Sequence, residues 1–184
     1  TAVVGVLAAA MAVAVVRGNP IQNVKLLPTI GLIVGCIGIV GLGLLDDRYG
    51  LRGRQKLFGQ ILICTLLVLC GYKFENTSFF GFPIDFGFFA IFVSVGWLLL
   101  AINSMNLIDG ADGLCSSVGW VACAGFASMA SSQGHLAEAA FASAMAGALL
   151  GFLVHNFPPA KVFLGDSGSM LVGLVLGALA IRTS

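Results

Sequence analysis

Charged side chains are scarce in this sequence: Asp, Glu, Lys and Arg together make up 9% of its 184 residues. A soluble domain carries about 25% charged residues, so this chain has too few to cover a water-facing surface. Its net charge of +1 excludes the basic face that a nucleic-acid-binding protein needs. Apolar side chains are abundant instead, at 59%. The composition therefore indicates a protein that lies in a membrane and binds no nucleic acid.

The sequence also lacks cysteine and histidine residues in an arrangement typical of a metal site or a catalytic base. The five cysteines stand singly in or beside apolar runs, as small buried residues do, and their spacing fits no metal site. The two histidines, His135 and His155, bear on the string Gly165-Asp166-Ser167-Gly168, which is familiar from serine proteases. A serine nucleophile needs a base within reach. We expect His135 on the opposite membrane face and His155 at the end of a span, so we interpret Asp166 as the functional group.

Long apolar runs predict the fold. A helix that crosses the hydrocarbon core needs about 20 residues, and polar flanks or local thinning let shorter runs span it. The candidate spans are residues 1–16, 29–45, 57–72, 88–102, 114–130, 138–154 and 170–181. The sequence therefore predicts an all-α, polytopic transmembrane helix bundle of about seven spans. Since no internal repeat or linker interrupts it, we expect one membrane-embedded domain over residues 1–184, a fragment truncated at both ends.

One connection is rich in aromatic residues. Residues 74–89 contain Gly81 and Pro83, which we expect to form a turn between runs of phenylalanine. We expect a short hairpin here that anchors the chain at the membrane interface.

Five of the eight acidic residues fall in three connections, residues 46–56, 103–113 and 155–169. Two predicted spans separate each connection from the next, and an even number of crossings returns the chain to the same side. All three connections should therefore face one compartment. Basic residues are densest in residues 48–56, which favours the cytoplasm. The five acids are Asp46, Asp47, Asp109, Asp112 and Asp166.

The ends of the predicted helices suggest a chemistry for these acids. Asp46 and Asp47 close a span at its negative end, where a divalent cation or basic residues would relieve their repulsion. Asp112-Gly113 and Ser167-Gly168-Ser169 precede spans, and helix starts bind anions. Acids for a metal and helix starts for phosphate indicate magnesium-assisted phosphoryl chemistry. The alternative is that the acids are helix caps and solvated loop charges.

Two other classes of function stay open. A secondary transporter is also apolar, but its acids should lie near the bilayer midplane on broken helices. A structural subunit would need none of these acids.

Three segments then resemble one family. They are LGLLDDRYGLRGRQKLFGQ, NSMNLIDGADGL and NFPPAKVFLGDSGS, which are similar to the three signature loops of the polyprenyl-phosphate N-acetylhexosamine-1-phosphate transferases (glycosyltransferase family 4). The similarity covers residues 29–173, with the loops in the family's order.

The resemblance implies an activity, a cofactor and a location. Such enzymes are multi-pass proteins of the plasma membrane with cytoplasmic active-site loops. They transfer a sugar-1-phosphate from a UDP-sugar to undecaprenyl or another polyprenyl phosphate and release UMP, which initiates synthesis of a cell-envelope polysaccharide. They require Mg²⁺, with Mn²⁺ as an alternative ion. A homodimer is an open alternative for the oligomeric state.

The resemblance also implies roles for residues. Asp46 and Asp47 match the family's acid pair, associated with the lipid phosphate and the metal, and one of them is an open candidate for a base. Lys56 matches a lysine near the phosphates, and Asp166 matches the acid that coordinates Mg²⁺. The residues at the nucleotide side are Asn106, Asp109 and Asp112 of the central loop, and Gly110, Asn156 and Phe163 of a uridine pocket.

The donor sugar depends on the branch of the family. Phe157-Pro158-Pro159 resembles the undecaprenyl-phosphate GlcNAc-1-phosphate transferases, so we expect GlcNAc-1-phosphate as the transferred group. The alternative is a phospho-MurNAc-pentapeptide transferase of peptidoglycan synthesis.

Overall fold

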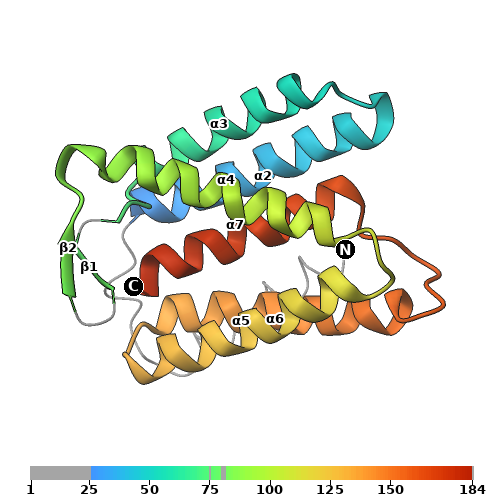
Figure 1. Ribbon diagram of the computed structural model, residues 1–184. Coiled ribbons are helices and arrows are strands. Elements are labelled where there is room, and N and C mark those ends of the chain that lie inside the picture. Colours follow the sequence, from blue (N-terminus) through green and yellow to red (C-terminus); the bar gives the residue numbers. More distant parts are fainter. Residues whose placement is uncertain (1–25, 75, 80–81, 184) are drawn as a thin grey trace. The chain divides into compact units, whose positions relative to one another are not determined.

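The computed structural model describes residues 26–183 apart from 75, 80 and 81, and most of this range is helical (Figure 1). The expected all-α class is confirmed, with one small two-stranded hairpin added. The expected span 1–16 lies outside the described residues. The described chain forms two compact units: a four-helix unit, residues 26–107 and 165–182, and a hairpin unit, residues 108–164. That residues 1–184 form one domain stays a prediction.

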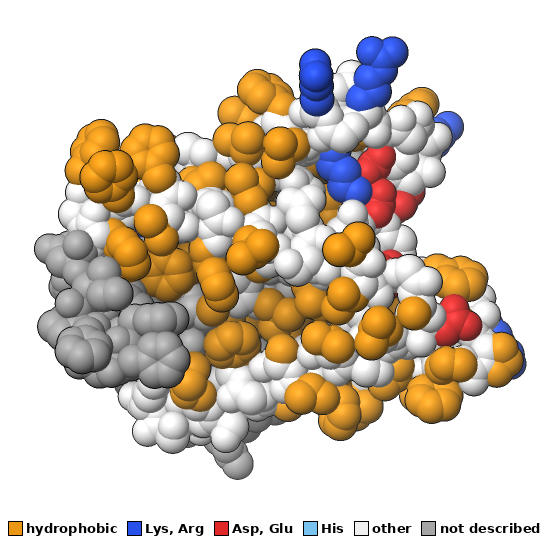
Figure 2. All heavy atoms as spheres, in the orientation of Figure 1, with side chains coloured by type: hydrophobic (Ala, Val, Ile, Leu, Met, Phe, Trp, Pro, Cys, Tyr) orange, Lys and Arg blue, Asp and Glu red, His pale blue; other side chains and the backbone are white. Residues whose placement is uncertain are grey.

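The four-helix unit consists of α2 (Leu26–Tyr49), α3 (Gly53–Leu69), α4 (Ala90–Ile108) and α7 (Gly165–Thr183). These helices carry apolar side chains on nearly all of their sides, as helices that face lipid do. Apolar side chains cover much of the visible helix surface in Figure 2, whereas Lys and Arg side chains gather around the connection between α2 and α3. Arg48, Arg52 and Arg54 are exposed there.

Five helices of the described chain are long and apolar enough to cross a membrane, so this is a multi-pass membrane protein. They are residues 26–49, 87–108, 114–132, 136–156 and 165–183. The expected span 57–72 corresponds to α3, which has 17 residues and is not among the five. α3 begins earlier than its apolar run and carries Arg54, Lys56 and Gln60 in its first half.

The core of the four-helix unit draws on all four helices. Ile39 of α2, Leu67 of α3, Leu98 of α4 and Leu174 of α7 are fully buried in one cluster. Glycines let the backbones approach closely, as is common in membranes. A Cβ added to Gly43 of α2 would lie 2.3 Å from the Cα of Ser167, so the first turn of α7 packs directly on the last turns of α2.

The hairpin unit contains α5 (Leu114–Ser132) and α6 (Leu136–Asn156), which pack against each other. Gly134, with φ of +78°, forms the tight turn that reverses the chain between them. Glycine adopts this left-handed conformation without the steric penalty of a side chain.

The expected short hairpin is confirmed, but Pro83, which we expected in its turn, lies in the second strand and pairs with Ser78. β1 (Asn76–Phe79) pairs antiparallel with β2 (Phe82–Asp85), and a short 3₁₀ turn (Gly87–Phe89) leads from it into α4. The expected turn at Gly81 lies outside the described residues.

The expected helix bounds were too short at the acidic ends. α2 continues to Tyr49 and includes Asp46 and Asp47, while α7 begins at Gly165 and includes Asp166. These acids therefore lie on helix ends rather than in loops. The physical reason is that helical backbone bonding continues past the end of an apolar run when polar residues satisfy the helix terminus.

Candidate active site

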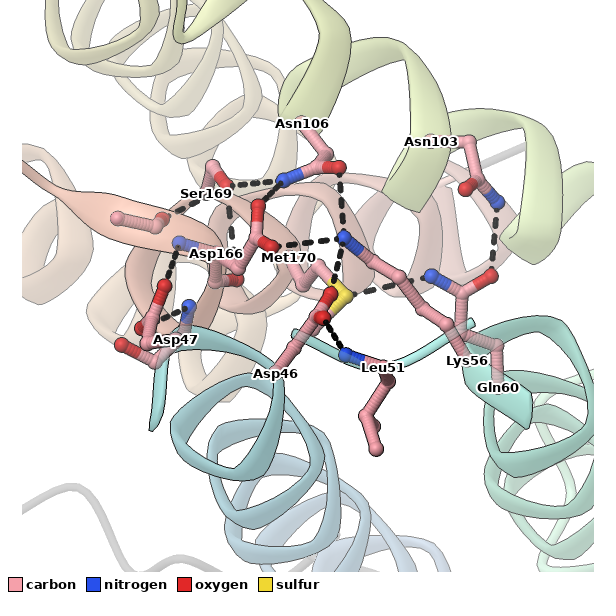
Figure 3. A network of polar contacts seen from close by, with 12 residues as sticks. Asp46, Asp47, Leu51, Lys56, Gln60, Asn103, Asn106, Asp166, Ser169 and Met170 are labelled. Carbon is pink, nitrogen blue, oxygen red and sulfur yellow. Dashed lines mark hydrogen bonds and ion pairs between the residues drawn. The ribbon is translucent and has the colours of Figure 1, made fainter. Parts of the chain in front are cut away.

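The Lys56 ammonium joins three other helices of the four-helix unit (Figure 3). Its Nζ lies 2.8 Å from Oδ2 of Asp46 on α2 and 3.0 Å from Oδ2 of Asp166 on α7. It also donates a hydrogen bond to Oδ1 of Asn106 on α4 over 3.0 Å. An ammonium has three donors, so all of them are engaged. We call Asp46, Asp47, Lys56, Asn106 and Asp166 the Lys56 cluster.

The protonation state of Lys56 follows from these contacts. Burial disfavours the charged ammonium, but the hydrogen bonds and charges of Asp166 and Asp46 outweigh burial and hold the pKa of Lys56 above its ordinary value. Lys56 is therefore a permanent cation at neutral pH.

Asn106 connects α4 to the first turn of α7. Its Nδ2 donates to Oδ1 of Asp166 and, over 2.9 Å, to Oγ of Ser169. The Ser169 hydroxyl in turn donates to the carbonyl of Gly165 over 2.8 Å. Since the amide oxygen accepts from Lys56, both ends of the Asn106 side chain are used and its orientation is fixed.

Asp46 is buried at the end of α2. Its Oδ1 accepts the backbone N–H of Leu51 over 2.8 Å, while Oδ2 faces Lys56. The bond to Leu51 fixes the turn between α2 and α3, in which Gly50 has a φ of +61°. Through these two contacts, Asp46 places its charge beside Lys56 and positions the start of α3, the helix that carries Lys56.

Asp47 caps α7 from a different helix. Its two carboxylate oxygens accept the backbone N–H groups of Asp166, over 2.9 Å, and of Ser167, over 3.3 Å. A carboxylate at a helix N-terminus is favoured by the free N–H groups and by the helix dipole. The anion site that the sequence predicted at this helix start is therefore occupied by the protein's own carboxylate.

The donor set of the Lys56 cluster fits a magnesium ion only in part. The cluster contains three carboxylates and one ammonium, which pairs with two of them, so negative charge is in excess. Among the described residues, no group of three or more Asp, Glu, His or Cys side chains could hold a metal ion. Mg²⁺ is commonly bound by one or two carboxylates, with substrate phosphates and water completing its shell. The cluster suits that mode of binding, and it does not suit an all-protein cage.

Two further predicted site residues fix a loop of the hairpin unit. Asn156 is 3% exposed, donates to the carbonyl of Val162 over 2.9 Å and accepts from Oγ of Ser116 over 2.8 Å. Oδ2 of Asp112 accepts the backbone N–H of Ala160 over 3.0 Å. These bonds tie residues 157–164 to the start of α5, so Asn156 positions the loop rather than presenting a free side chain.

The predicted residues thus fall into two sets. The structure brings together Asp46, Asp47, Lys56, Asn106 and Asp166. The others belong to the hairpin unit, where the Phe163 ring is 68% exposed. The residues of this second set are Asp109, Gly110, Asp112, Asn156 and Phe163.

Sequence reasoning missed several polar residues. Gln60 and Ser116 are fully buried, and Asn103 bonds to Gln60. A signal was present for Gln60, because a polar residue inside an apolar helix usually has a specific partner.

The chain is similar to a known family and to several known proteins. A family model described as glycosyl transferase family 4 matches residues 29–184. The chain is 38% identical over 165 residues to a phospho-N-acetylmuramoyl-pentapeptide-transferase of Shouchella clausii, covering 83% of this chain and 51% of that protein. A protein of the same name from Halalkalibacterium halodurans is 39% identical over 163 residues, covering 82% and 50%.

A third relative carries another name. The "Probable undecaprenyl-phosphate N-acetylglucosaminyl 1-phosphate transferase" of Bacillus subtilis is 34% identical over 152 residues, covering 82% of this chain and 42% of that protein. The chain spans about half the length of the curated relatives that it matches.

Proposed function

We propose, since this chain belongs to glycosyl transferase family 4, that its protein transfers an N-acetylhexosamine-1-phosphate from a UDP-sugar to polyprenyl phosphate. An oxygen of the lipid phosphate attacks the sugar-bearing phosphorus of the donor. The bond from this phosphorus to the oxygen that bridges the two donor phosphates breaks, and UMP leaves. The product is a sugar linked to the lipid through a pyrophosphate. The observation that carries the proposal is the convergence of Asp46, Lys56 and Asp166 from three helices.

Charge is the main obstacle to this reaction. Two phosphorylated reactants must approach each other, so stabilising negative charge lowers the barrier most. Lys56 supplies a fixed positive charge, because its raised pKa keeps it protonated. Asn106 and Asp46 hold its ammonium in place.

A strong base is not required. A phosphate monoester has its second pKa near 6 and is largely dianionic at pH 7. Neither Asp46 nor Asp47 therefore has to act as a base in this mechanism: Asp46 orients Lys56, and Asp47 holds the first turn of α7.

Asp166 and one acid of the Asp46-Asp47 pair would hold Mg²⁺, with Mn²⁺ as the alternative ion. The excess of carboxylates and the hard oxygen donors support this assignment. When bound, the ion would neutralise phosphate oxygens of the donor.

The hairpin unit offers groups for the nucleotide. The exposed Phe163 ring can stack on a uracil base, and the Asn156 and Asp112 bonds hold the loop that carries it. Asp109 and Gly110 complete the set of residues that we propose to bind the nucleotide.

Two UDP-sugars are candidates for the donor. The Phe157-Pro158-Pro159 segment supports UDP-GlcNAc. The higher identity to phospho-N-acetylmuramoyl-pentapeptide-transferases, 38% and 39% against 34%, supports UDP-MurNAc-pentapeptide. A secondary transporter has less support, because Asp46, Asp47 and Asp166 lie in end turns of helices rather than mid-helix.

The test uses the full-length protein in membranes with undecaprenyl phosphate and each UDP-sugar in turn, with and without Mg²⁺. UMP release and labelled lipid are measured together. Transfer from one donor, in a reaction that needs both lipid and metal, supports the proposal and identifies the donor. Absence of lipid-linked product from either donor contradicts it.

A further inference from the structure

A second layer of polar contacts lies beside the Lys56 cluster (Figure 3). Gln60 is fully buried on α3, and its Oε1 accepts from Nδ2 of Asn103 on α4 over 2.9 Å. Its Nε2 donates to Sδ of Met170 on α7 over 3.2 Å. We call Gln60, Asn103 and Met170 the amide layer.

Each member of the amide layer lies one helical turn from a member of the Lys56 cluster. Gln60 follows Lys56 by four residues on α3, and Met170 follows Asp166 by four on α7. On α4, Asn103 precedes Asn106 by three residues. Residues three or four apart share one face of a helix. The same faces of α3, α4 and α7 therefore meet twice, once in the Lys56 cluster and once around the Gln60 amide.

Stability does not account for a glutamine at position 60. A buried amide costs free energy unless its donors and acceptor are bonded, and a thioether is a weak acceptor. A methionine of similar volume would fill the same space without that cost. What an amide adds is direction, because its bonds form only at particular distances and angles. Asn103 is likewise held, since its Nδ2 also donates to the carbonyl of Leu99 over 2.8 Å.

We propose that Gln60 is a positioning residue for the transfer reaction. Through Asn103 and Met170 it fixes the rotation and axial position of α3 relative to α4 and α7. Lys56 Nζ is thereby held within 3.0 Å of its partners on both helices. Gln60 is buried and contacts no reacting group. The reaction affected rests on the proposed function; the effect on Lys56 does not.

The first test compares Gln60→Met with Gln133→Met in the full-length protein. The control makes the same chemical change at an exposed position at the end of α5. Misplacement of a catalytic group by about 1 Å costs up to about 100-fold in rate. We therefore expect Gln60→Met to lower kcat about 10- to 100-fold with KM values nearly unchanged, and its melting temperature to equal or exceed that of the wild type. The control should behave as the wild type.

The second test needs no activity. Amine acylation of Lys56 is followed by mass spectrometry, with the exposed Lys161 as internal reference. In the wild type the three contacts of Lys56 should slow its modification relative to Lys161. Gln60→Met should speed the modification of Lys56 severalfold and leave Lys161 unchanged. Because Gln60→Asn shortens one partner and Asn103→Gln lengthens the other, the double variant should recover much of the protection that Gln60→Asn alone loses.

Two results overturn the positioning role. One is an unchanged modification rate of Lys56 in Gln60→Met. The other is a loss of activity accompanied by a lower melting temperature, which would make Gln60 an ordinary core residue. Absence of transfer by the wild-type protein contradicts the proposed function alone, and the acylation rates still decide whether Gln60 positions Lys56.

Discussion

The carboxylate of Asp47 in the last turn of α2 accepts the backbone N–H of Asp166 in the first turn of α7 over 2.9 Å, although 119 residues separate them in sequence. One acid of the cluster thus holds the backbone of another. The C-terminus of α2 is negative and the N-terminus of α7 is positive, so the carboxylate is stabilised mainly by the second helix. This contact fixes the position of the backbone from which the Asp166 side chain extends.

Replacing Asp47 should destabilise α7 in a graded way. Asp47→Ala removes the cap and should lower the free energy of unfolding by about 1 kcal/mol. Asp47→Asn keeps one acceptor oxygen for Asp166 and should cost less. Chemical denaturation in detergent measures both, with Gln133→Ala as the control. Equal stability of Asp47→Ala and the wild type would show that the cap is unimportant.

Gly43 should not tolerate a methyl group. An added Cβ would lie 2.3 Å from Ser167 Cα, so Gly43→Ala must push the first turn of α7 away from α2. We expect lower thermal stability and a loss of transfer activity. Gly41→Ala is the matched control on the same helix, because an added Cβ there meets nothing within 4 Å. The control should be neutral or stabilising by up to about 1 kcal/mol; similar behaviour of the two variants would contradict the packing described.

Lys56→Met should show a characteristic pH dependence. The pKa of Lys56 is raised on folding, so its ion pairs stabilise the protein fully below the unfolded pKa of about 10.4 and lose this effect as pH rises through the folded value. The stability difference between wild type and Lys56→Met should be constant from about pH 7 to 9 and change only above about pH 10. Unfolding measured at several pH values tests this. A difference that already changes near neutrality would mean that Lys56 is not held as described.

Asn156→Ala should release the loop after α6. The substitution leaves the Val162 carbonyl and the Ser116 hydroxyl without their partner, at a cost of about 1–3 kcal/mol. Hydrogen exchange across residues 157–164 should rise, and it should stay unchanged in Ser117→Ala, which removes a neighbouring hydroxyl. Unaltered exchange in Asn156→Ala would place the support of the loop elsewhere.

The charged part of the candidate site could be predicted from the sequence. Asp46 and Asp166 stand out in an apolar chain, and the count of crossings placed their connections on one side, whereas Lys56 was indicated by the resemblance to the family. The contacts in the four-helix unit agree, since the last turns of α2 and α4 meet the first turns of α3 and α7.

The amide layer could not be predicted in the same way. Because α3 and α4 are apolar on nearly all sides, no stripe of polar residues shows which face turns inward. Gln60 and Asn103 lie on different helices, 43 residues apart in sequence. Glycines such as Gly173 let α7 approach α4 closely, since an added Cβ there would lie 2.5 Å from Ile102 Cα. Such packing depends on contacts between distant residues, which local sequence does not encode. The same is true of Asp47, whose role as a cap requires the position of α7.

The most direct measurement is UMP release by the full-length protein and its Asp166→Asn variant, in matched membranes with Mg²⁺, undecaprenyl phosphate and the preferred UDP-sugar. The substitution keeps the size of the side chain but removes the charge that pairs with Lys56. We predict that turnover falls by at least about 100-fold in a protein that remains folded. Turnover of Asp166→Asn at the wild-type rate would contradict the assignment of this cluster as the active site.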